Sequence, residues 1–544
     1  MALYIKRVET VVSFKQLASE QAAAGADVPV LEPDAPVSGI AFSRLPKYAY
    51  ACDAMPKVPR ISSVTDFARV PDMDDSSEGS GGDAATGAGT AAGVVAAASV
   101  SLPSKAALAS HASDADGGWQ RFGLGGDADE CGSSCEGSIV DAGCVPVSSL
   151  LDSALLAMWE ERAEQGLFRY DVTACPTKVV PGLYGFVAQL NEGRYSKKRP
   201  TEFRVDQVVQ AFDPAKFNFT KAFKREVLFA FEPAAPGAAS SFEEAGRCNA
   251  APNVVLINVS PIDYGHVLLC PRVLDCIPQV LAPDTCLAAL HFALEVGNPY
   301  LRVGFNSLGA FATINHLHFQ AYYLQAPMPC ERAPTAPLAR ITPGSSAAGS
   351  SKRRRPDSGG DSVLVSRLCD YPVRGWVVEG PSLAAMAQVL GEASRAMQAA
   401  NMPHNMLIAE CGSRVFLWPQ RYAERQACGE VAEHLLDIGV NPAVWEISGH
   451  LVLKRAQDYA DFTEAAAWEL LAAVSLTEEQ LAAAEQVLFG MGARAAAHGA
   501  GSNGLDAGVA VDEGKVPAAA AAVDECEQGV AAMAVEAAAV ACSS

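Results

Sequence analysis

The stretch that decides the fold is TINHLHFQAYYL, residues Thr313–Leu324. It holds two of the chain's nine histidines, His316 and His318, in an apolar and aromatic run, with Gln320 at the next alternate position. Alternate side chains of an extended strand project to the same face. We therefore predict a buried strand with two imidazoles and a carboxamide aligned on one face. The opposite face is then apolar and directed into a core: Leu317, Phe319 and Ala321.

Three polar side chains on one buried face need partners. Burying each of them without a hydrogen bond would cost roughly 1–3 kcal/mol. Either they satisfy one another inside the sheet, or they face a ligand. Paired strand histidines can also bind zinc, but no Cys-x-x-Cys or His-x-x-x-His motif lies nearby to complete a site. The cysteines Cys131, Cys135 and Cys144 fall in an acidic segment, so we predict no metal and no cofactor.

The arrangement suits nucleophilic catalysis on a phosphate. A neutral imidazole is a good nucleophile at neutral pH because its ordinary pKa is about 6.5. It needs one free ring nitrogen and an acceptor for the other, which the backbone carbonyl of the preceding histidine can provide. The amide of Gln320 can donate to a phosphate oxygen without acting as a base. Small or amide-bearing residues that could contact phosphates come just before: Asn306, Ser307, Gly309 and Thr313.

The net charge and the cysteine content indicate which classes of partner and which cellular compartment suit this protein. The 544 residues carry a formal net charge of -21, which argues against nucleic acid and anionic membranes as partners. Fifteen cysteines are scattered without a dense spacing pattern, as expected for thiols in a reducing compartment. The first residues lack a signal-peptide pattern, so we predict a soluble cytoplasmic protein. The basic run Lys352–Arg355 could be a nuclear import signal or a solvated loop.

Length and compositional bias divide the chain. It is too long for one compact core, and its Gly/Ala/Ser-rich stretches cannot bury enough apolar area to offset their ordering entropy. Two blocks of alternating short strands and helices predict an α+β fold with a largely antiparallel sheet. The predicted parts are an N-terminal segment partly packed on the core (1–70), a disordered acidic linker (71–143), a catalytic domain (144–332), a flexible insert (333–365), a second, degenerate domain (366–489) and an Ala-rich tail (490–544).

A weak internal similarity links the two blocks. NVVLINV…GHVLLCPR in the first block and HNMLIAE…RVFLWPQ in the second share a strand–turn–strand–Pro layout. We interpret it as an indication of a degenerate duplication.

The motifs together resemble a known family. His-x-His-x-Gln after a Gly/Ser/Asn loop, with Pro-x-x-x-Gly-His upstream, resembles the histidine triad superfamily. Glutamine in place of a third histidine resembles its transferase branch, typified by galactose-1-phosphate uridylyltransferase. Longer runs, among them GLYGFVAQLNEGR, KKRPTEFRVDQVVQAFDPAKFNFTK and NPAVWEISGHLVLKR, are similar to the GDP-L-galactose phosphorylases of plants and green algae, which act in ascorbate synthesis. The similarity covers about 170–330 and 366–480 and the opening IKRVETVVS.

This resemblance implies a fold and a mechanism. The fold would be histidine-triad-like antiparallel sheets with flanking helices, in two tandem units. His318 would attack the α-phosphorus of GDP-L-galactose and release L-galactose 1-phosphate, and inorganic phosphate would then take the guanylyl group from His318 as GDP. His316 would orient the strand, and Gln320 would hold the phosphate of the intermediate. Related uridylyltransferases are dimers with shared sites, so the resemblance also allows a homodimer. Some relatives hold a structural zinc, but we predict none here because no accompanying cysteine pair is present.

Other residues are weaker candidates. His266 follows a turn, where backbone contact and ligand contact are equally reasonable. Lys216 and Asn218 could reach a phosphate or sugar, whereas His450 is more often structural in such a context. One basic cluster would suit an anionic substrate, although solvated charge is the default: Arg194, Lys197, Lys198 and Arg199.

Two alternatives to a phosphorylase stay open from the sequence. One is a guanylyltransferase that uses a hexose 1-phosphate as the acceptor. The other is a nucleotide-binding regulatory protein without turnover, which the intact set of His316, His318 and Gln320 argues against.

Overall fold

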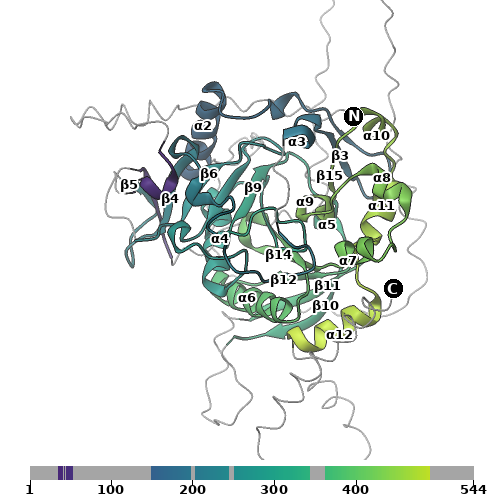
Figure 1. The fold of residues 1–544 in the computed structure, drawn as a ribbon. Helices are drawn as coiled ribbons and strands as arrows, with labels where there is room; N and C mark the ends of the chain where they lie inside the picture. The colour runs from purple at the N-terminus through teal and green to yellow at the C-terminus, as the bar shows by residue number, and fades with distance from the viewer. Residues whose placement is uncertain are drawn as a thin grey trace, which may run out of the picture. The chain divides into compact units, whose positions relative to one another are not determined.

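A sheet of twelve strands, to which both predicted blocks contribute, runs through the protein (Figure 1). The computed structural model describes residues 35–40, 42, 45–52, 149–197, 203–243, 250–343 and 362–489, all within one compact unit. The predicted acidic linker and Ala-rich tail lie outside these residues.

The strand order confirms an α+β fold with a largely antiparallel sheet. All neighbouring strands of this sheet are antiparallel except β1 and β4, which are parallel. In spatial order the strands are β10 (Thr335–Ile341), β11 (Val363–Leu368), β12 (Trp376–Glu379), β14 (Arg414–Pro419), β13 (His404–Ala409), β8 (Leu301–Asn306), β9 (Phe319–Tyr323), β7 (Val267–Cys270), β6 (Val254–Ile257), β4 (Val227–Pro233), β1 (Lys47–Tyr50) and β5 (Ser241–Glu243).

One five-stranded pattern occurs twice in this sheet. In the first copy the chain passes through β4, β6, β7, helix α4 (Pro283–Val296), β8 and β9, and the spatial order is β4-β6-β7-β9-β8. The second copy runs through β10, β11, β12, helix α6 (Leu383–Ala399), β13 and β14, in the order β10-β11-β12-β14-β13. The copies join where β8 pairs with β13, with Asn306 opposite Asn405. The predicted tandem units are therefore confirmed.

The sequence similarity that suggested this duplication, however, compares strands that are not equivalent. It matches β6 and β7 with β13 and β14, whereas their places in the pattern make β6 and β7 equivalent to β11 and β12. Almost every residue of β6, β7, β13 and β14 is buried. A strand buried on both faces reads as a continuous apolar run, so unrelated central strands look alike in sequence.

The second copy is degenerate at one connection. Residues 307–318 join β8 to β9 and include both histidines of the motif. The equivalent connection between β13 and β14 is only 410–413, a tight turn in which Cys411 has a left-handed φ of 53°. A loop this short leaves the second copy without a counterpart of the histidine-bearing segment.

Alternation along the central strands builds a core on each face of the sheet. Met406 and Ile408 of β13 pack in one core with residues of α4 and α6, whereas Leu407 and Ala409 pack in the other. Helices α4 and α6 lie against each other over the first face (Figure 1). Smaller helices from the C-terminal part cover the second face.

The longest α-helices are α2 (Leu150–Glu164), α4 and α6. Ser149 caps the N-terminus of α2, because its side chain accepts a hydrogen bond from the backbone N–H of Asp152. The helices besides α4 and α6 are α2 (Leu150–Glu164), α3 (Glu192–Lys197), α5 (Pro329–Arg332), α7 (Tyr422–Ala427), α8 (Glu433–Ile438), α9 (Val444–Ser448), α10 (Ala456–Asp461), α11 (Glu464–Ala472) and α12 (Glu478–Phe489). The 3₁₀ helices are η1 (Val37–Gly39), η4 (Val172–Ala174), η5 (Phe219–Lys221), η6 (Lys224–Glu226), η7 (Val273–Asp275) and η9 (Glu410–Gly412). Within the described ranges, no helix has the length and apolar character needed to cross a membrane.

A second, three-stranded sheet joins distant parts of the chain. Its order is β15 (His450–Leu453), β3 (Val187–Leu190) and β2 (Thr177–Val179), and β15 and β3 are parallel. The backbone N–H of Asn191 donates to the carbonyl of Leu453 at 2.9 Å. Parallel strands end at the same edge of a sheet, so the residues after β3 and after β15 lie next to each other.

Strands β10 and β1 lie within two of the segments that the sequence analysis set apart. The predicted flexible insert at 333–365 begins with strand β10, which pairs with β11 as an edge strand. Pro337 lies at its register shift, a position that proline tolerates on an edge; the remainder of the insert, with the basic run Lys352–Arg355, falls outside the described residues. Within the N-terminal segment, β1 pairs with β4, and Tyr48 and Tyr50 belong to the core that contains α4.

Candidate active site

Both histidines precede β9, with His316 in a bend, and only Gln320 is on the strand itself. The prediction of one strand carrying all three was wrong in this respect. The backbone N–H groups of Leu317 and His318 bond to the carbonyl of Ile277 and to the side chain of Gln279, not to a neighbouring strand. The predicted apolar face is confirmed, since Leu317, Phe319 and Ala321 are all buried in the core that contains α4.

His318 is held with one ring nitrogen available for attack. Its Nδ1 lies 2.8 Å from the carbonyl oxygen of His316 and 3.0 Å from Oε1 of Gln279. Both neighbours are acceptors, so Nδ1 carries the proton and Nε2 keeps its lone pair. The ring also packs against Phe219, with centroids 4.9 Å apart. The predicted carbonyl acceptor is thus present, together with a second acceptor that the sequence did not reveal.

Gln279 is that second acceptor, and sequence reasoning missed it. Its Oε1 accepts from the backbone N–H of His318 at 3.0 Å, and its Nε2 donates to the carbonyls of Asn306 and His318 at 2.9 and 3.1 Å. These neighbours fix the orientation of the amide. The side chain is buried and connects the end of β8 to the start of β9. Its only sequence signal is a lone amide in the apolar run CIPQVLAP.

His316 supports the loop through its ring. Its Nδ1 accepts from the backbone N–H of Phe219 at 3.1 Å, and the ring lies edge-on to Phe212. Its Nε2 is buried and has no hydrogen-bond partner among the described residues. These contacts fit the orienting role that the resemblance implied for His316.

Lys216 and Asn218 are not brought to the reacting centre. Asn218 caps η5 by accepting from the backbone N–H of Thr220 at 3.1 Å, and its Nδ2 donates to the carbonyl of Lys216. The ammonium of Lys216 lies over the ring of Phe203. This segment reaches the histidines instead through Phe219, which touches both rings.

A cavity of about 130 Å³ lies beside Gln320, and Asn306 and Thr313 also line it. Oδ1 of Asn306 accepts from Nδ2 of Asn405 at 2.6 Å and from the backbone N–H of Val444 at 2.8 Å. The amide NH₂ of Asn306 is therefore the end that a ligand can use. Helix α9 can come this close because β8 has Gly304 opposite it, where a Cβ would lie 2.7 Å from Cγ1 of Val444.

Ser307 and Gly309, which were predicted to contact phosphate, have structural roles in the loop between β8 and β9. Oγ of Ser307 accepts from the backbone N–H of His404 at 2.9 Å and donates to the carbonyl of Leu308 at 3.0 Å. Gly309 has φ of +77°, and a Cβ there would lie 3.0 Å from Pro403 and from the carbonyl of Val205. Neither residue lines the cavity beside Gln320. Both turn the chain so that Thr313 and the histidines return toward the sheet.

His266 lies behind Gln320. Its Nδ1 accepts from the backbone N–H of Ile262 at 2.8 Å, and its Nε2 lies 3.2 Å from Nδ2 of Asn258. Burial lowers the pKa of His266 well below its ordinary value, the charge of Arg194 adds to the shift, and the side chain of Gln320 opposes it. Oε1 of Gln320 nevertheless has no hydrogen bond of good geometry among the described residues. Because Oε1 of Gln320 is buried, the NH₂ is the end of this side chain left to face the cavity.

Burial keeps the histidines of the motif uncharged. It lowers the pKa of His318 to about 4, although the hydrogen bond to the carbonyl of His316 opposes the shift. It lowers the pKa of His316 to about 4 as well, with the neighbouring His318 adding to the effect. A neutral imidazole at physiological pH is the form that can act as a nucleophile.

Comparison with known proteins places the chain in a family. Family models described as GDPGP1-like, N-terminal domain, and GDPGP1-like, C-terminal domain, match residues 150–322 and 348–494. GDP-L-galactose phosphorylase 1 of Arabidopsis thaliana is 52% identical over 341 residues, which are 62% of this chain and 72% of that protein. The chain belongs to the GDPGP1-like family. The resemblance noted from the sequence motifs is thereby confirmed.

More distant relatives were also found. GDP-D-glucose phosphorylase 1 of Homo sapiens is 35% identical over 342 residues, which are 59% of this chain and 79% of the human protein. Among solved structures, yeast Ap4A phosphorylase Apa2 in complex with Ap4A is 13% identical and has a TM-score of 0.37, over 60% of this chain and 99% of that one.

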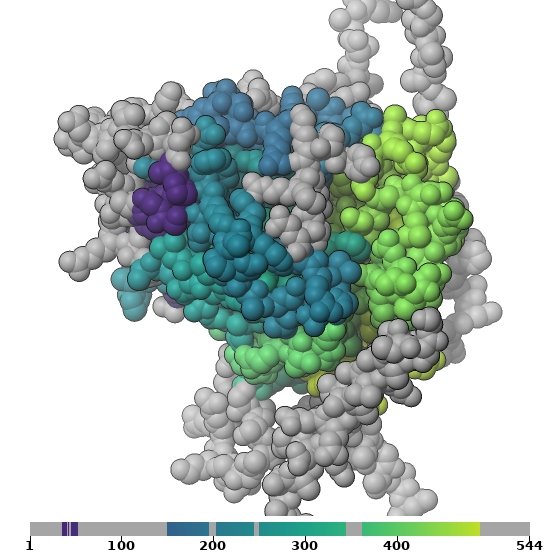
Figure 2. Space-filling model, viewed as in Figure 1, coloured from purple at the N-terminus to yellow at the C-terminus, as the bar shows by residue number. Residues whose placement is uncertain are grey.

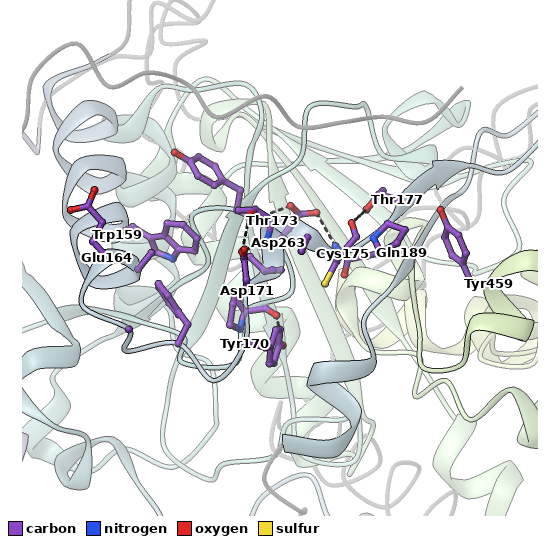
Figure 3. A pocket seen from close by; sticks show the side chains of 18 residues that line it. Trp159, Glu164, Tyr170, Asp171, Thr173, Cys175, Thr177, Gln189, Asp263 and Tyr459 are labelled. Atoms are coloured by element: carbon purple, nitrogen blue, oxygen red, sulfur yellow. Dashed lines mark hydrogen bonds between the residues drawn. The ribbon is translucent and has the colours of Figure 1, made fainter. Parts of the chain in front are cut away.

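A larger cavity among the described residues of this GDPGP1-like chain is not the candidate site. Its volume is about 860 Å³, and no predicted site residue lines it. Figure 3 shows Trp159 and Tyr459 at opposite ends of it and Asp263, which accepts from Nε2 of Gln189 at 3.3 Å, between them. This cavity is unfavourable for the phosphates of a nucleotide sugar, because Glu164 and Asp171 line it and no Lys or Arg does.

His450 is part of the packing between the two sheets. Its Nδ1 lies 2.7 Å from the hydroxyl of Tyr322, and its Nε2 lies 4.0 Å from Oδ2 of Asp263. Burial lowers the pKa of His450 to about 3 and raises the pKa of Asp263 to about 7. The contact is therefore not a permanent ion pair, in line with the structural role predicted for His450.

We expect the folded state of this GDPGP1-like chain to lose stability as the pH falls below about 6.5. Buried histidines with a lowered pKa bind protons more readily when unfolded, so the free energy of unfolding decreases from the unfolded pKa of about 6.5 down toward 4. Asp263, with its raised pKa, acts in the opposite direction. The buried histidines with a lowered pKa are His266, His291, His316, His318, His404 and His450.

Urea unfolding at pH 5.0 and 7.5 checks this expectation. His404→Gln should make the difference between the two pH values smaller, because it removes one buried titrating group. The matched control is His434→Gln, since the side chain of His434 is 62% exposed. A stability that is equal at both pH values in the unsubstituted protein would contradict the argument.

Proposed function

We propose that this chain is a GDP-L-galactose phosphorylase, which transfers a guanylyl group from GDP-L-galactose to inorganic phosphate and yields L-galactose 1-phosphate and GDP. The observation that carries the proposal is the neutral His318, with Nδ1 bonded to two acceptors and Nε2 left for attack. The substrate is supported by 52% identity with a relative named for GDP-L-galactose, against 35% for one named for GDP-D-glucose.

The first step forms a covalent intermediate. Nε2 of His318 attacks the α-phosphorus with its lone pair while the bond from that phosphorus to the bridging oxygen breaks. L-galactose 1-phosphate leaves with the electron pair, and the guanylyl group stays on His318. The ring becomes cationic in this step, and the acceptors at Nδ1, the His316 carbonyl and Oε1 of Gln279, stabilise that charge.

The second step reverses the first with a different acceptor. An oxygen of inorganic phosphate attacks the same phosphorus, the phosphorus–nitrogen bond breaks, and GDP is released. Donors fixed beside the transferred phosphoryl group lower the barrier to both steps. We assign this role to the amides of Gln320 and Asn306, which line one cavity. Because a carboxamide cannot act as a base, Gln320 does not activate water, and the intermediate waits for phosphate.

Mass measurement of the intact protein tests this proposal. We expect the mass of one guanylyl group to appear after mixing with GDP-L-galactose in phosphate-free buffer, and to disappear as GDP after a phosphate chase. An adduct that only a hexose 1-phosphate discharges would identify a guanylyltransferase instead. No adduct, and no GDP formed in the presence of phosphate, would favour a nucleotide-binding protein without turnover.

We further propose that the enzyme works in the cytoplasm and as a homodimer, without nucleic acid or membrane partners. The net charge of -21 supports the exclusion of polyanions, and the dimer follows from the related uridylyltransferases. Light scattering of the purified full chain tests the dimer, and a fluorescent fusion tests the compartment.

A further inference from the structure

We propose that Arg194 and Lys454 form one anion subsite, which binds the β-phosphate of the donor in the first step and inorganic phosphate in the second. This inference rests on the proposed function and adds the residues that select the acceptor. The two residues are far apart in the sequence: Arg194 lies in α3, before the first copy, and Lys454 follows β15, after the second copy.

The small sheet explains why these two cations meet. Lys454 directly follows β15, and Arg194 lies in the first turn of α3, just after β3. Because β3 and β15 are parallel with Leu190 opposite Leu453, both residues emerge at the same edge. The carbonyls of Ser260 and Gly439 hold them there, since NH1 of Arg194 donates to the first at 2.6 Å and Nζ of Lys454 donates to the second.

Both cations line the cavity that contains the phosphate-contacting amides. The cavity beside Gln320, Asn306 and Thr313 is also lined by Arg194 and Lys454. Glu446 is the one carboxylate in its lining, so the site carries a net positive charge on a chain of net charge -21. Arg194 lies close enough to His266 to depress its pKa, and His266 neighbours Gln320. The positive charge is therefore next to the group that we assign to the transferred phosphoryl.

The chemistry requires one position for two phosphates. In each step the attacking and leaving groups lie in line through the α-phosphorus, and His318 occupies one side. The leaving sugar phosphate and the incoming inorganic phosphate must therefore both occupy the other side. Two cations there attract a phosphate dianion but not a neutral water molecule. The subsite thus explains how the intermediate can select phosphorolysis over hydrolysis.

The proposed subsite includes only Arg194 from the basic cluster that the sequence showed. Lys197 ends α3, and nothing is described of its side chain. Lys198 and Arg199 lie outside the described residues.

The test uses Arg194→Met and Lys454→Met in the full chain. Each variant is charged slowly with excess GDP-L-galactose in phosphate-free buffer, freed of nucleotide, and mixed with increasing inorganic phosphate. We expect the second-order rate constant for discharge by phosphate to fall on the order of 10²-fold in each variant. Discharge by water alone should stay unchanged, because water does not need the cations. The matched control is Arg340→Met, an exposed arginine on edge strand β10.

Conservative variants keep the test decisive if methionine disturbs folding. Arg194→Lys and Lys454→Arg preserve the charge, so we expect most of the phosphate dependence to return. Unchanged discharge by phosphate in folded Arg194→Met and Lys454→Met would overturn the subsite while leaving the phosphorylase proposal intact. An equal loss of discharge by phosphate and by water would also overturn it, because it would indicate general damage to the loop. If the unsubstituted enzyme forms no guanylyl adduct at all, the proposed function fails instead.

Discussion

The variant His318→Asn should lose phosphorolysis by about 10⁴-fold or more in kcat, because the nucleophile is removed. Asparagine is the informative replacement. Its amide NH₂ can still donate toward the carbonyl of His316 and Oε1 of Gln279, the two acceptors that hold Nδ1. The loop should therefore keep its conformation while no atom can take the guanylyl group. Steady-state release of GDP and the mass of the protein after mixing with GDP-L-galactose measure the effect.

The control for this substitution is His434→Asn, an exposed histidine that pairs with Glu469. It should form the adduct and turn over like the unsubstituted enzyme. Substrate binding by His318→Asn, measured by calorimetry, should persist, since the phosphate-contacting amides remain. A guanylyl adduct on His318→Asn would show that another residue is the nucleophile and would contradict the assignment.

The second large effect is expected at Gln279, which is a positioning residue and does not touch substrate. Gln279→Met removes both acceptor contacts to His318 and both donor contacts to the carbonyls of Asn306 and His318. A nucleophile displaced by about 1 Å can lose on the order of 10²-fold in rate. We expect kcat to fall by this factor while KM for GDP-L-galactose changes little, because both polar atoms of the Gln279 side chain are already bonded to His318 and Asn306.

The variant Gln279→Glu separates positioning from simple structural damage. An ionised carboxylate keeps the acceptor contacts to His318 but repels the carbonyls of Asn306 and His318, which Nε2 of Gln279 now satisfies. Protonation of that buried carboxyl supplies a donor again. Activity of Gln279→Glu should therefore rise as the pH is lowered from 8 toward 6. The unsubstituted enzyme, in which burial lowers the pKa of His318 to about 4, should show no such rise.

Gln388→Met provides the matched control, because Gln388 is only partly buried on α6 and its amide makes an exposed hydrogen bond to Glu392. Its activity and pH profile should equal those of the unsubstituted enzyme. If Gln279→Glu has the same pH profile as the unsubstituted enzyme, the amide donors of Gln279 do not position His318.

Several features of this protein follow from the sequence alone because they depend on neighbours in the chain. The alternation around His316, His318 and Gln320 predicts which residues enter the core, and Leu317, Phe319 and Ala321 are indeed buried there. The carbonyl that holds His318 belongs to a residue two positions earlier. Short strands and helices in two blocks predict the α+β fold, and the ordered motifs identify the family.

Tertiary structure decides the features that depend on distant partners. Gln279 is 39 residues from His318 and reaches it only because β7, β8 and β9 are neighbours in the sheet. The same holds for Ser307 and Asn306. They bond to His404 and Asn405 of the second copy, and Asn306 also bonds to Val444 at the start of α9.

Arg194 and Lys454 are further apart in the sequence than any of these pairs. Nothing in either local sequence relates them, yet parallel pairing of β3 with β15 places both at one cavity. Local periodicity determines which face of an element is buried, whereas the partner of a buried polar group is determined by how the elements pack. The sequence by itself therefore determines the fold class and the family and predicts His318 as the nucleophile. The packing of the two copies and the small sheet decides which residues hold His318 and surround the cavity.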